Sequence, residues 1–243
     1  MNYLHSDKIK ELEVKSDEIR KLMTGNLFAV EQECTTCSLG VVDFLTLLYF
    51  HVLKHDPKDP EWKERDRLIL SSDHICLALY ATMAHAGYFP VEKLKTLRKF
   101  GSRPQDYPTR AFLPGIKKNS GLLGSLSQAV GMTIADRMDH KRSRDKFFYC
   151  LLGDKELQED QNWEAISLAG REQLHNLVAI IGRNNIQTGG LKENTIPFEP
   201  VVDKFEEFNW HVLNASINDF DDMDNAIGQA QSVFAKPTVI FVQ

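Results

Sequence analysis

The sequence lacks the features that mark several classes of protein. It has only four cysteines in 243 residues, too few for a disulfide framework, so the reducing cytosol is the default compartment. The formal net charge is −5 without a basic block, which argues against nucleic acid as a partner. No run of 18 apolar residues predicts a transmembrane helix. The polar beginning of the chain also lacks the apolar core of a signal peptide. We therefore expect a cytoplasmic protein without a membrane segment.

What remains is the composition of a globular protein. Hydrophobic residues make up 42% of the chain and charged residues 26%, and we find no internal repeat, low-complexity segment or linker. Helical patterns alternate with short apolar runs, which predicts an α/β fold with a mostly parallel sheet. We expect one domain over residues 1–243 with an N-terminal helical extension at residues 7–23. The predicted strands are Arg67–Leu70, Phe147–Leu152, Leu177–Ile181, Trp210–Leu213 and Thr238–Val242.

One predicted βαβ unit carries the clearest chemical signal. The apolar run Phe147–Leu152 ends at Gly153-Asp154, a helical pattern follows over residues 156–172, and the apolar run Leu177–Ile181 ends before Asn184. Because the carboxyl ends of parallel strands lie at one edge of a sheet, we expect Asp154 and Asn184 at the same edge. Ligands of open α/β sheets bind there. The alternative is a pair of turn-capping side chains at two strand ends.

Several motifs occur in an order that resembles the transketolase family. They are RDRLILSSDH, LYATMAHAGYFP, SQAVGM, GD-x-E-L-Q-E, WEA, and KFEEFNWHV with KPTVI. Together they cover roughly residues 10 to 243 and resemble the N-terminal, diphosphate-binding domain of that family. The resemblance implies the thiamine diphosphate-binding fold, with three layers and helices on both faces of the sheet. It also implies an enzyme that transfers a two-carbon unit with thiamine diphosphate and Mg²⁺ as cofactors.

The resemblance also implies which residues hold the cofactors. The Mg²⁺ ligands would be the side chains of Asp154 and Asn184 and the backbone carbonyl of Ile186. This donor set suits Mg²⁺, which prefers oxygen ligands and usually keeps phosphate oxygens and water as well. Lys155 replaces a family glycine, and it could contact the diphosphate or crowd the site. The other implied cofactor contacts are Gly153, Glu159, Leu123 and Gly124, with an exposed helix-surface role as the alternative for Glu159.

The family's full-length members carry a second domain, which binds the aminopyrimidine ring and supplies the glutamate that activates the cofactor. The present sequence ends at Gln243, before any such domain. The resemblance therefore implies the N-terminal subunit of a split transketolase, inactive alone, whose active site lies at the interface with a second, pyrimidine-binding polypeptide. We expect a heterotetramer of two such chains and two partners.

The substrate side departs from the family pattern at two positions. Cys34 and Tyr107 stand where the family has histidines, whereas His74 is retained. Since histidines there handle the sugar hydroxyls, we expect His74, Cys34 and Tyr107 to line the substrate funnel of an enzyme with a non-standard donor or acceptor. Loop or packing roles are the alternatives for His74 and Tyr107.

Two other functions remain open at this point. The altered motif residues are also compatible with a non-catalytic scaffold or regulatory subunit that has lost the cofactor. The Cys34-x-x-Cys37 spacing is compatible with a thiol redox protein. The other two cysteines, Cys76 and Cys150, stand alone in apolar runs and are expected to be buried, so a zinc site lacks a second ligand pair.

Overall fold

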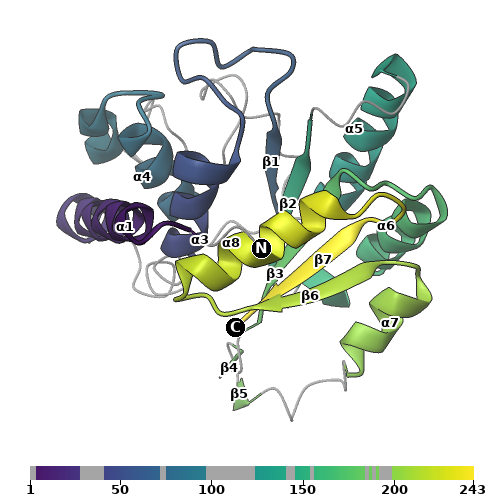
Figure 1. Ribbon diagram of the computed structural model, residues 1–243. Helices are drawn as coiled ribbons and strands as arrows, with labels where there is room; N and C mark the ends of the chain where they lie inside the picture. Colours follow the sequence, from purple (N-terminus) through teal and green to yellow (C-terminus); the bar gives the residue numbers. More distant parts are fainter. Residues whose placement is uncertain are drawn as a thin grey trace.

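A five-stranded sheet forms the centre of the molecule (Figure 1). The structure is a computed structural model that describes residues 4–27, 41–71, 75–96, 124–140, 146–153, 156–183, 186–187, 190–191 and 199–243. In sheet order the strands are β1 (Arg67–Leu70), β2 (Phe148–Gly153), β3 (Leu177–Gly182), β7 (Thr238–Val242) and β6 (His211–Ala215). Each neighbouring pair is parallel. The expected α/β fold is confirmed, and each predicted strand is present within two residues of its expected ends.

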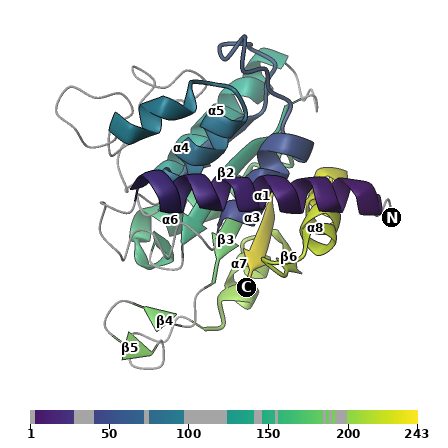
Figure 2. The same ribbon diagram turned by 90° about the vertical axis from the view of Figure 1, so that its left-hand side faces the viewer.

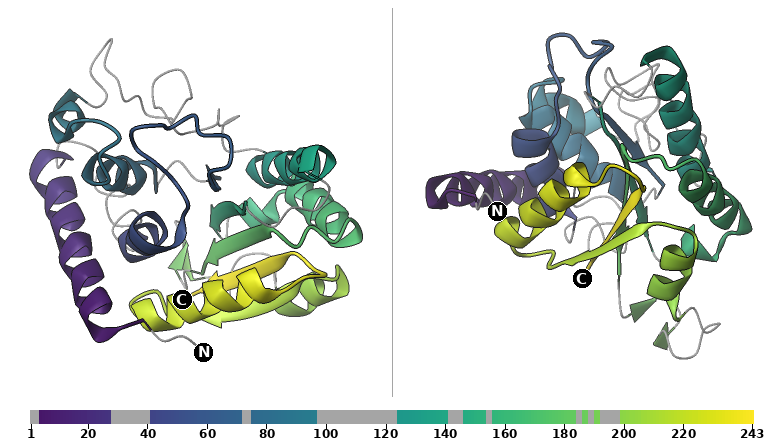
Figure 3. Two further views of the ribbon diagram at one scale, coloured as in Figure 1. Left: turned by 45° about the horizontal axis from the view of Figure 1, so that its top comes forward. Right: turned by 45° about the vertical axis from the view of Figure 1, so that its right-hand side comes forward.

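Helices cover both faces of this sheet, as Figures 1 and 3 show. Alternate residues of each strand point to opposite faces, so Tyr149 and Leu151 join one hydrophobic cluster while Cys150 and Leu152 join the other. The first cluster is covered by α1 (Ser6–Leu27), α3 (Val42–Leu47), α4 (Cys76–His85), the 3-10 helix η3 (Val91–Thr96) and α8 (Phe220–Ser232). The second is covered by α5 (Ser125–His140), α6 (Asp160–Arg171) and α7 (Val201–Glu207). The three-layer expectation is therefore confirmed.

The N-terminal helix α1 lies across the outside of the first helical layer (Figure 2). Its apolar stripe, with Leu12 and Ile19, is fully buried. The buried carboxylate of Asp43 on α3 accepts hydrogen bonds from Ser16 and, at 2.7 Å, from Arg20. This contact fixes α1 against α3 in a single register. Among the helices that the structure describes, none is both long and apolar enough to cross a membrane.

Two details of the elements were not predicted. A small antiparallel ribbon, β4 (Ile186–Gln187) with β5 (Gly190–Leu191), follows β3 and projects beyond the sheet (Figure 2). Helix α3 also continues directly into the π-helical turn η1 (Leu48–Val52).

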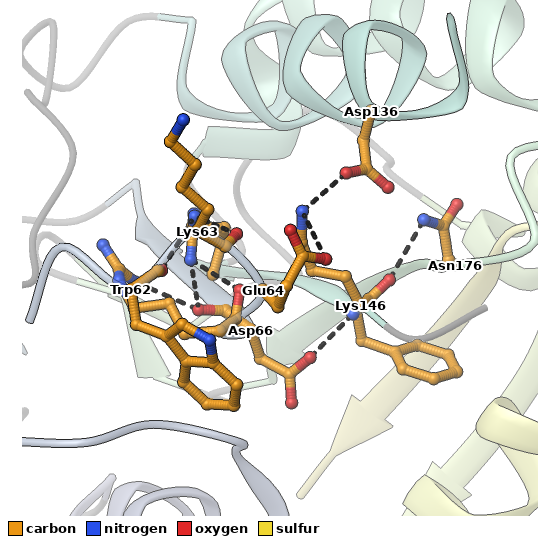
Figure 4. A network of polar contacts seen from close by, with 10 residues as sticks. Trp62, Lys63, Glu64, Asp66, Asp136, Lys146 and Asn176 are labelled. Atoms are coloured by element: carbon orange, nitrogen blue, oxygen red, sulfur yellow. Dashed lines mark hydrogen bonds and ion pairs between the residues drawn. The ribbon is translucent and has the colours of Figure 1, made fainter. Parts of the chain in front are cut away.

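A network of buried charges closes the amino-terminal edge of the sheet (Figure 4). The ammonium of Lys146, just before β2, donates to Asp136 on α5 at 2.8 Å. The carboxylate of Asp66, just before β1, accepts from the backbone amide of Phe147 at 2.7 Å. Asn176, just before β3, donates to the Lys146 carbonyl at 3.1 Å. The starts of β1, β2 and β3 are thus joined by side chains as well as by the ladder.

Candidate active site

The predicted site lies at the opposite, carboxyl-terminal edge. Here β2 ends at Gly153 and β3 ends at Gly182, and these two residues are register partners in the parallel ladder. Asp154 follows the first and Asn184 comes two residues after the second. The strands that precede these two residues therefore end side by side at one edge, as expected, while Asp154 and Asn184 themselves lie outside the described residues.

The structure describes only part of the predicted site. Gly153, Gly124 and Glu159 are described, and the backbone of Ile186 belongs to β4. The remaining predicted site residues lie outside the described ranges: Cys34, His74, Tyr107, Leu123, Asp154, Lys155 and Asn184. Cys37 lies outside them as well, so the redox hypothesis is not tested. Cys76 and Cys150 are buried thiols, as expected, and burial with the nearby charge of Glu156 raises the pKa of Cys150.

The helix that we expected over residues 156–172 is interrupted. Glu156–Gln158 forms a 3-10 turn, η4, and Glu159 then adopts an extended conformation before α6 begins at Asp160. The reason is a local competition for the Glu156 backbone carbonyl, which accepts from the Glu159 amide and from the side-chain amide of Asn162. These bonds close a tight turn directly after β2.

A second glutamate, Glu156, lies inside this turn, and sequence reasoning assigned it no role. Its side chain is 6% exposed, and its Oε2 accepts a hydrogen bond from the Gly153 amide at 2.8 Å. The sequence signal for this contact was the spacing of Gly153 and Glu156. A carboxylate three residues after the last glycine of a strand can fold back and accept from the amide of that glycine.

Three polar side-chain atoms at this edge are buried without a hydrogen-bond partner among the described residues: Ser71 Oγ, Glu159 Oε2 and Asn162 Oδ1. Ser71 directly follows β1, and its amide donates to Leu151 of β2. Glu159 and Asn162 are one helical turn apart. Burial, followed by the negative charge of Glu156, raises the pKa of the Glu159 carboxyl. Unpartnered buried polar atoms are uncommon in native proteins, so this edge is suited to a polar ligand or a partner chain.

The start of α5 completes this edge. The Ser125 hydroxyl donates to the Leu70 carbonyl at 2.8 Å, which holds the helix start against the end of β1. Gly124 has a φ of +85°, a conformation that L side chains rarely adopt, and a Cβ there would lie 3.4 Å from the Gln161 side chain. Because Gln161 is in the first turn of α6, the amino ends of α5 and α6 meet here. Helix amino ends favour anions such as a diphosphate, so these residues fit such a group.

Comparison with known proteins agrees with this geometry. Residues 13–243 match the family described as transketolase, thiamine diphosphate binding domain. The chain is 36% identical over 98% of its length, and 86% of the relative, to the 6-deoxy-6-sulfo-D-fructose transketolase subunit SqwG of Clostridium sp. (strain MSTE9). It is 32% identical over 96% of its length, and 82% of the relative, to an apulose-4-phosphate transketolase subunit of Phocaeicola vulgatus.

Solved structures give the same result. The transketolase from Leishmania mexicana superposes with a TM-score of 0.85 at 27% identity, covering 96% of this chain. The chain spans 36% of that longer protein, the share expected of one of its domains. On the strength of the family match, the two similar subunits and the shared fold, the chain belongs to the transketolase family and corresponds to its thiamine diphosphate-binding domain.

Proposed function

We propose that this chain is the diphosphate-binding subunit of a split, Mg²⁺-dependent transketolase-like enzyme that transfers a two-carbon unit. Thiamine diphosphate, when bound, supplies the chemistry for breaking and forming the carbon–carbon bond. The observation that carries the proposal is the side-by-side ending of β2 and β3 at Gly153 and Gly182. The buried oxygens beside these ends, which lack a hydrogen-bond partner among the described residues, support it because they suit contacts with polar groups of a ligand or a partner chain.

The Mg²⁺ site in this proposal consists of the Asp154 carboxylate, the Asn184 amide oxygen and the Ile186 carbonyl. Support comes from the strand register, in which Gly153 and Gly182, the last residues of the two preceding strands, are partners, and from the donor chemistry, which suits a hard cation. Lys155 would lie beside the diphosphate, where a cation is favourable.

We propose that the partner is a second, pyrimidine-binding subunit, in a cytoplasmic assembly of two plus two chains. Two relatives of nearly this length are named as subunits of transketolases, which supports a divided enzyme. The partner would complete the site and supply the glutamate that activates the cofactor. Glu159 and Asn162, whose buried oxygens lack partners among the described residues, are then available for contacts with the cofactor or with the partner.

We propose further that the donor is a ketose other than the common sugar phosphates. The support is twofold. By the resemblance, Cys34 and Tyr107 occupy positions where the family has histidines, and two of the relatives are named for 6-deoxy-6-sulfo-D-fructose and apulose 4-phosphate. Together with His74, these side chains would form the wall of the funnel that meets the sugar hydroxyls.

Calorimetry of the chain in complex with the subunit that co-purifies with it tests the proposal. Titration with thiamine diphosphate should release heat only when Mg²⁺ is present. Asp154→Ala or Asn184→Ala should weaken binding by at least about tenfold, since each removes a metal ligand. Asp203→Ala, an exposed carboxylate in the first turn of α7, is the matched control and should bind as the wild type does. Equal binding by Asp154→Ala would overturn the metal assignment.

The alternative of a scaffold subunit predicts a different result. Its support is the replacement of family residues at Cys34 and Lys155. In that case the wild-type complex would bind no thiamine diphosphate with or without Mg²⁺, and it would release no product from either of the two named sugars with an aldehyde acceptor.

A further inference from the structure

We propose that Glu156 is a positioning residue that sets the direction in which the chain leaves β2 toward Asp154. The inference rests on the proposed function, because its effect on the cofactor acts through the metal ligand that follows Gly153. Its geometric basis is the hydrogen bond from the Gly153 amide to the Glu156 carboxylate.

The backbone groups of successive strand residues point to alternate sides of the strand, and this explains why the Gly153 amide needs an acceptor. The carbonyls of Phe147, just before β2, and of Leu151 in β2 accept from the amides of Arg67, which begins β1, and of Ser71, which follows it. In a parallel strand the amide and carbonyl of a residue point to the same side, and every second residue repeats that direction. The amide of Gly153, two residues after Leu151, therefore points toward the β1 side.

In the described part of the chain, no strand continues on that side. The last register pair between β1 and β2 joins Leu70 to Leu151, so the described ladder between these strands ends two residues before Gly153. The Glu156 Oε2 takes the place of a β1 carbonyl as acceptor, at 2.8 Å. A buried amide without an acceptor would cost free energy, and a carboxylate is a stronger acceptor than a carbonyl.

The glycine at position 153 leaves room for the same contact. A Cβ on Gly153 would lie 2.6 Å from the Glu156 Oε2, closer than van der Waals contact allows. The carboxylate therefore occupies the volume that any other residue at this strand end would fill. Gly153 and Glu156 form one unit, and the chain emerging from them begins with Asp154.

The Glu156 side chain is itself held in place. It is buried on the 3-10 turn η4, and its backbone carbonyl accepts from both Glu159 and Asn162 at the start of α6. Glu156 thus contacts the end of β2 through its side chain and the start of α6 through its backbone carbonyl. A change at Glu156 alters the strand end without removing any residue proposed to touch the cofactor.

The test compares Glu156→Ala and Glu156→Gln in the full chain with its co-purifying subunit, using thiamine diphosphate and Mg²⁺ as probes. Glu156→Ala should weaken Mg²⁺-dependent binding by about tenfold, as expected for the loss of a hydrogen bond to a charged acceptor. Glu156→Gln keeps an acceptor oxygen and should restore binding to within about threefold. Gln158→Ala, an exposed side chain on the same turn, should change neither binding nor melting temperature.

A double-substitution cycle separates positioning from general destabilisation. Gly153→Ala alone should lower the melting temperature of the cofactor-free chain, because the new methyl group meets the carboxylate. Adding Glu156→Ala removes that clash, so the double variant should melt no lower than Gly153→Ala. Additive losses would show that the two residues are not coupled, and would overturn the inference.

The outcomes distinguish this inference from the proposed function. If the wild type binds the cofactor and Glu156→Ala binds it equally well, the positioning role is wrong and the function stands. If Glu156→Gln loses as much affinity as Glu156→Ala, charge rather than hydrogen-bond geometry is responsible, and the inference is again overturned. If the wild-type complex binds no cofactor, the proposed function fails, even where the cycle shows that the Gly153–Glu156 contact is present.

Discussion

The two edges of the central sheet differ in how their buried polar groups are satisfied. At the amino-terminal edge, Lys146, Asp66 and Asn176 each have defined partners across the starts of three strands (Figure 4). At the carboxyl-terminal edge, Glu159 and Asn162 each keep a buried oxygen without a partner in the described part of the chain. The amino-terminal edge (the closed edge) is therefore satisfied within the described residues, whereas the carboxyl-terminal edge (the open edge) keeps buried oxygens that these residues do not satisfy.

The pKa shifts of one carboxyl group at each edge, Asp66 and Glu159, show the same difference. Burial raises the pKa of Asp66 even though the backbone amides of Phe147 and Lys54 donate to it and act in the opposite direction. For Glu159, burial and the charge of Glu156 raise the pKa, and no hydrogen-bond donor among the described residues offsets them. The first carboxylate is buried with its partners. For the second, a hydrogen-bond donor from outside the described residues would be favourable.

The largest expected effect is at the closed edge. Lys146→Met removes the ammonium that donates to the Asp136 carboxylate, whose side chain is 8% exposed, and should destabilise the chain by about 3–5 kcal/mol. Urea denaturation measures this. The control is Lys63→Met, which changes an exposed lysine in the loop before β1. Lys146→Met combined with Asp136→Leu should recover most of the loss, and a double variant as unstable as the single one would contradict the buried-pair account.

A smaller effect is expected from backbone geometry at the open edge. Gly124→Ala places a side chain at a φ of +85° and should cost about 1–2 kcal/mol. Gly131→Ala on the same helix, where a Cβ would meet nothing within 4 Å, should stabilise by about 0.5–1 kcal/mol. Thermal denaturation should therefore give shifts of opposite sign. Shifts of the same sign would show that the start of α5 does not depend on this glycine.

The smallest expected effect concerns the carboxyl group of Glu159, which lacks a partner among the described residues. Because the pKa of Glu159 is raised above its ordinary value of 4.5, the folded state favours the protonated form, and stability is lost as the pH rises above that value. Glu159→Gln cannot ionise, so at pH 7 it should be more stable than the wild type by at most about 1 kcal/mol, since solvent screens part of the effect.

Melting curves from pH 4 to pH 8 check this prediction. The difference between wild type and Glu159→Gln should shrink toward the acid end. Asp160→Asn, the adjacent exposed carboxylate, is the control and should show no such gain. A Glu159→Gln variant less stable than the wild type at pH 7 would mean that the carboxylate has a partner that stabilises its charge.

Much of the fold was predictable because its strands are buried on both faces. A strand such as Leu177–Gly182 is a continuous apolar run bounded by polar residues, and that pattern does not depend on distant contacts. The adjacency of the β2 and β3 ends followed from the βαβ unit. The family motifs then identified the proposed metal ligands, since two strand ends alone do not specify a ligand.

The details that were missed depend on contacts that local sequence patterns do not encode. The helix expected from Glu156 is interrupted because the Asn162 side chain bonds to the Glu156 backbone carbonyl, and helical periodicity cannot show this. The closed edge joins Asp66 to Phe147, residues 81 positions apart, so its pairing follows only from the strand order. Such contacts become visible when the topology is known.

Helix α5 is fixed at both of these edges. Near its start, Ser125 is bonded to the end of β1, and near its other end Asp136 is bonded to Lys146 before β2. The distance between these two contacts, about 16 Å along the helix axis, must match the height of the sheet that the helix crosses. Insertion of one residue between them would rotate one contact by about 100° relative to the other. The number of residues between Ser125 and Asp136 is therefore fixed by these two contacts, whatever the other residues of α5 are.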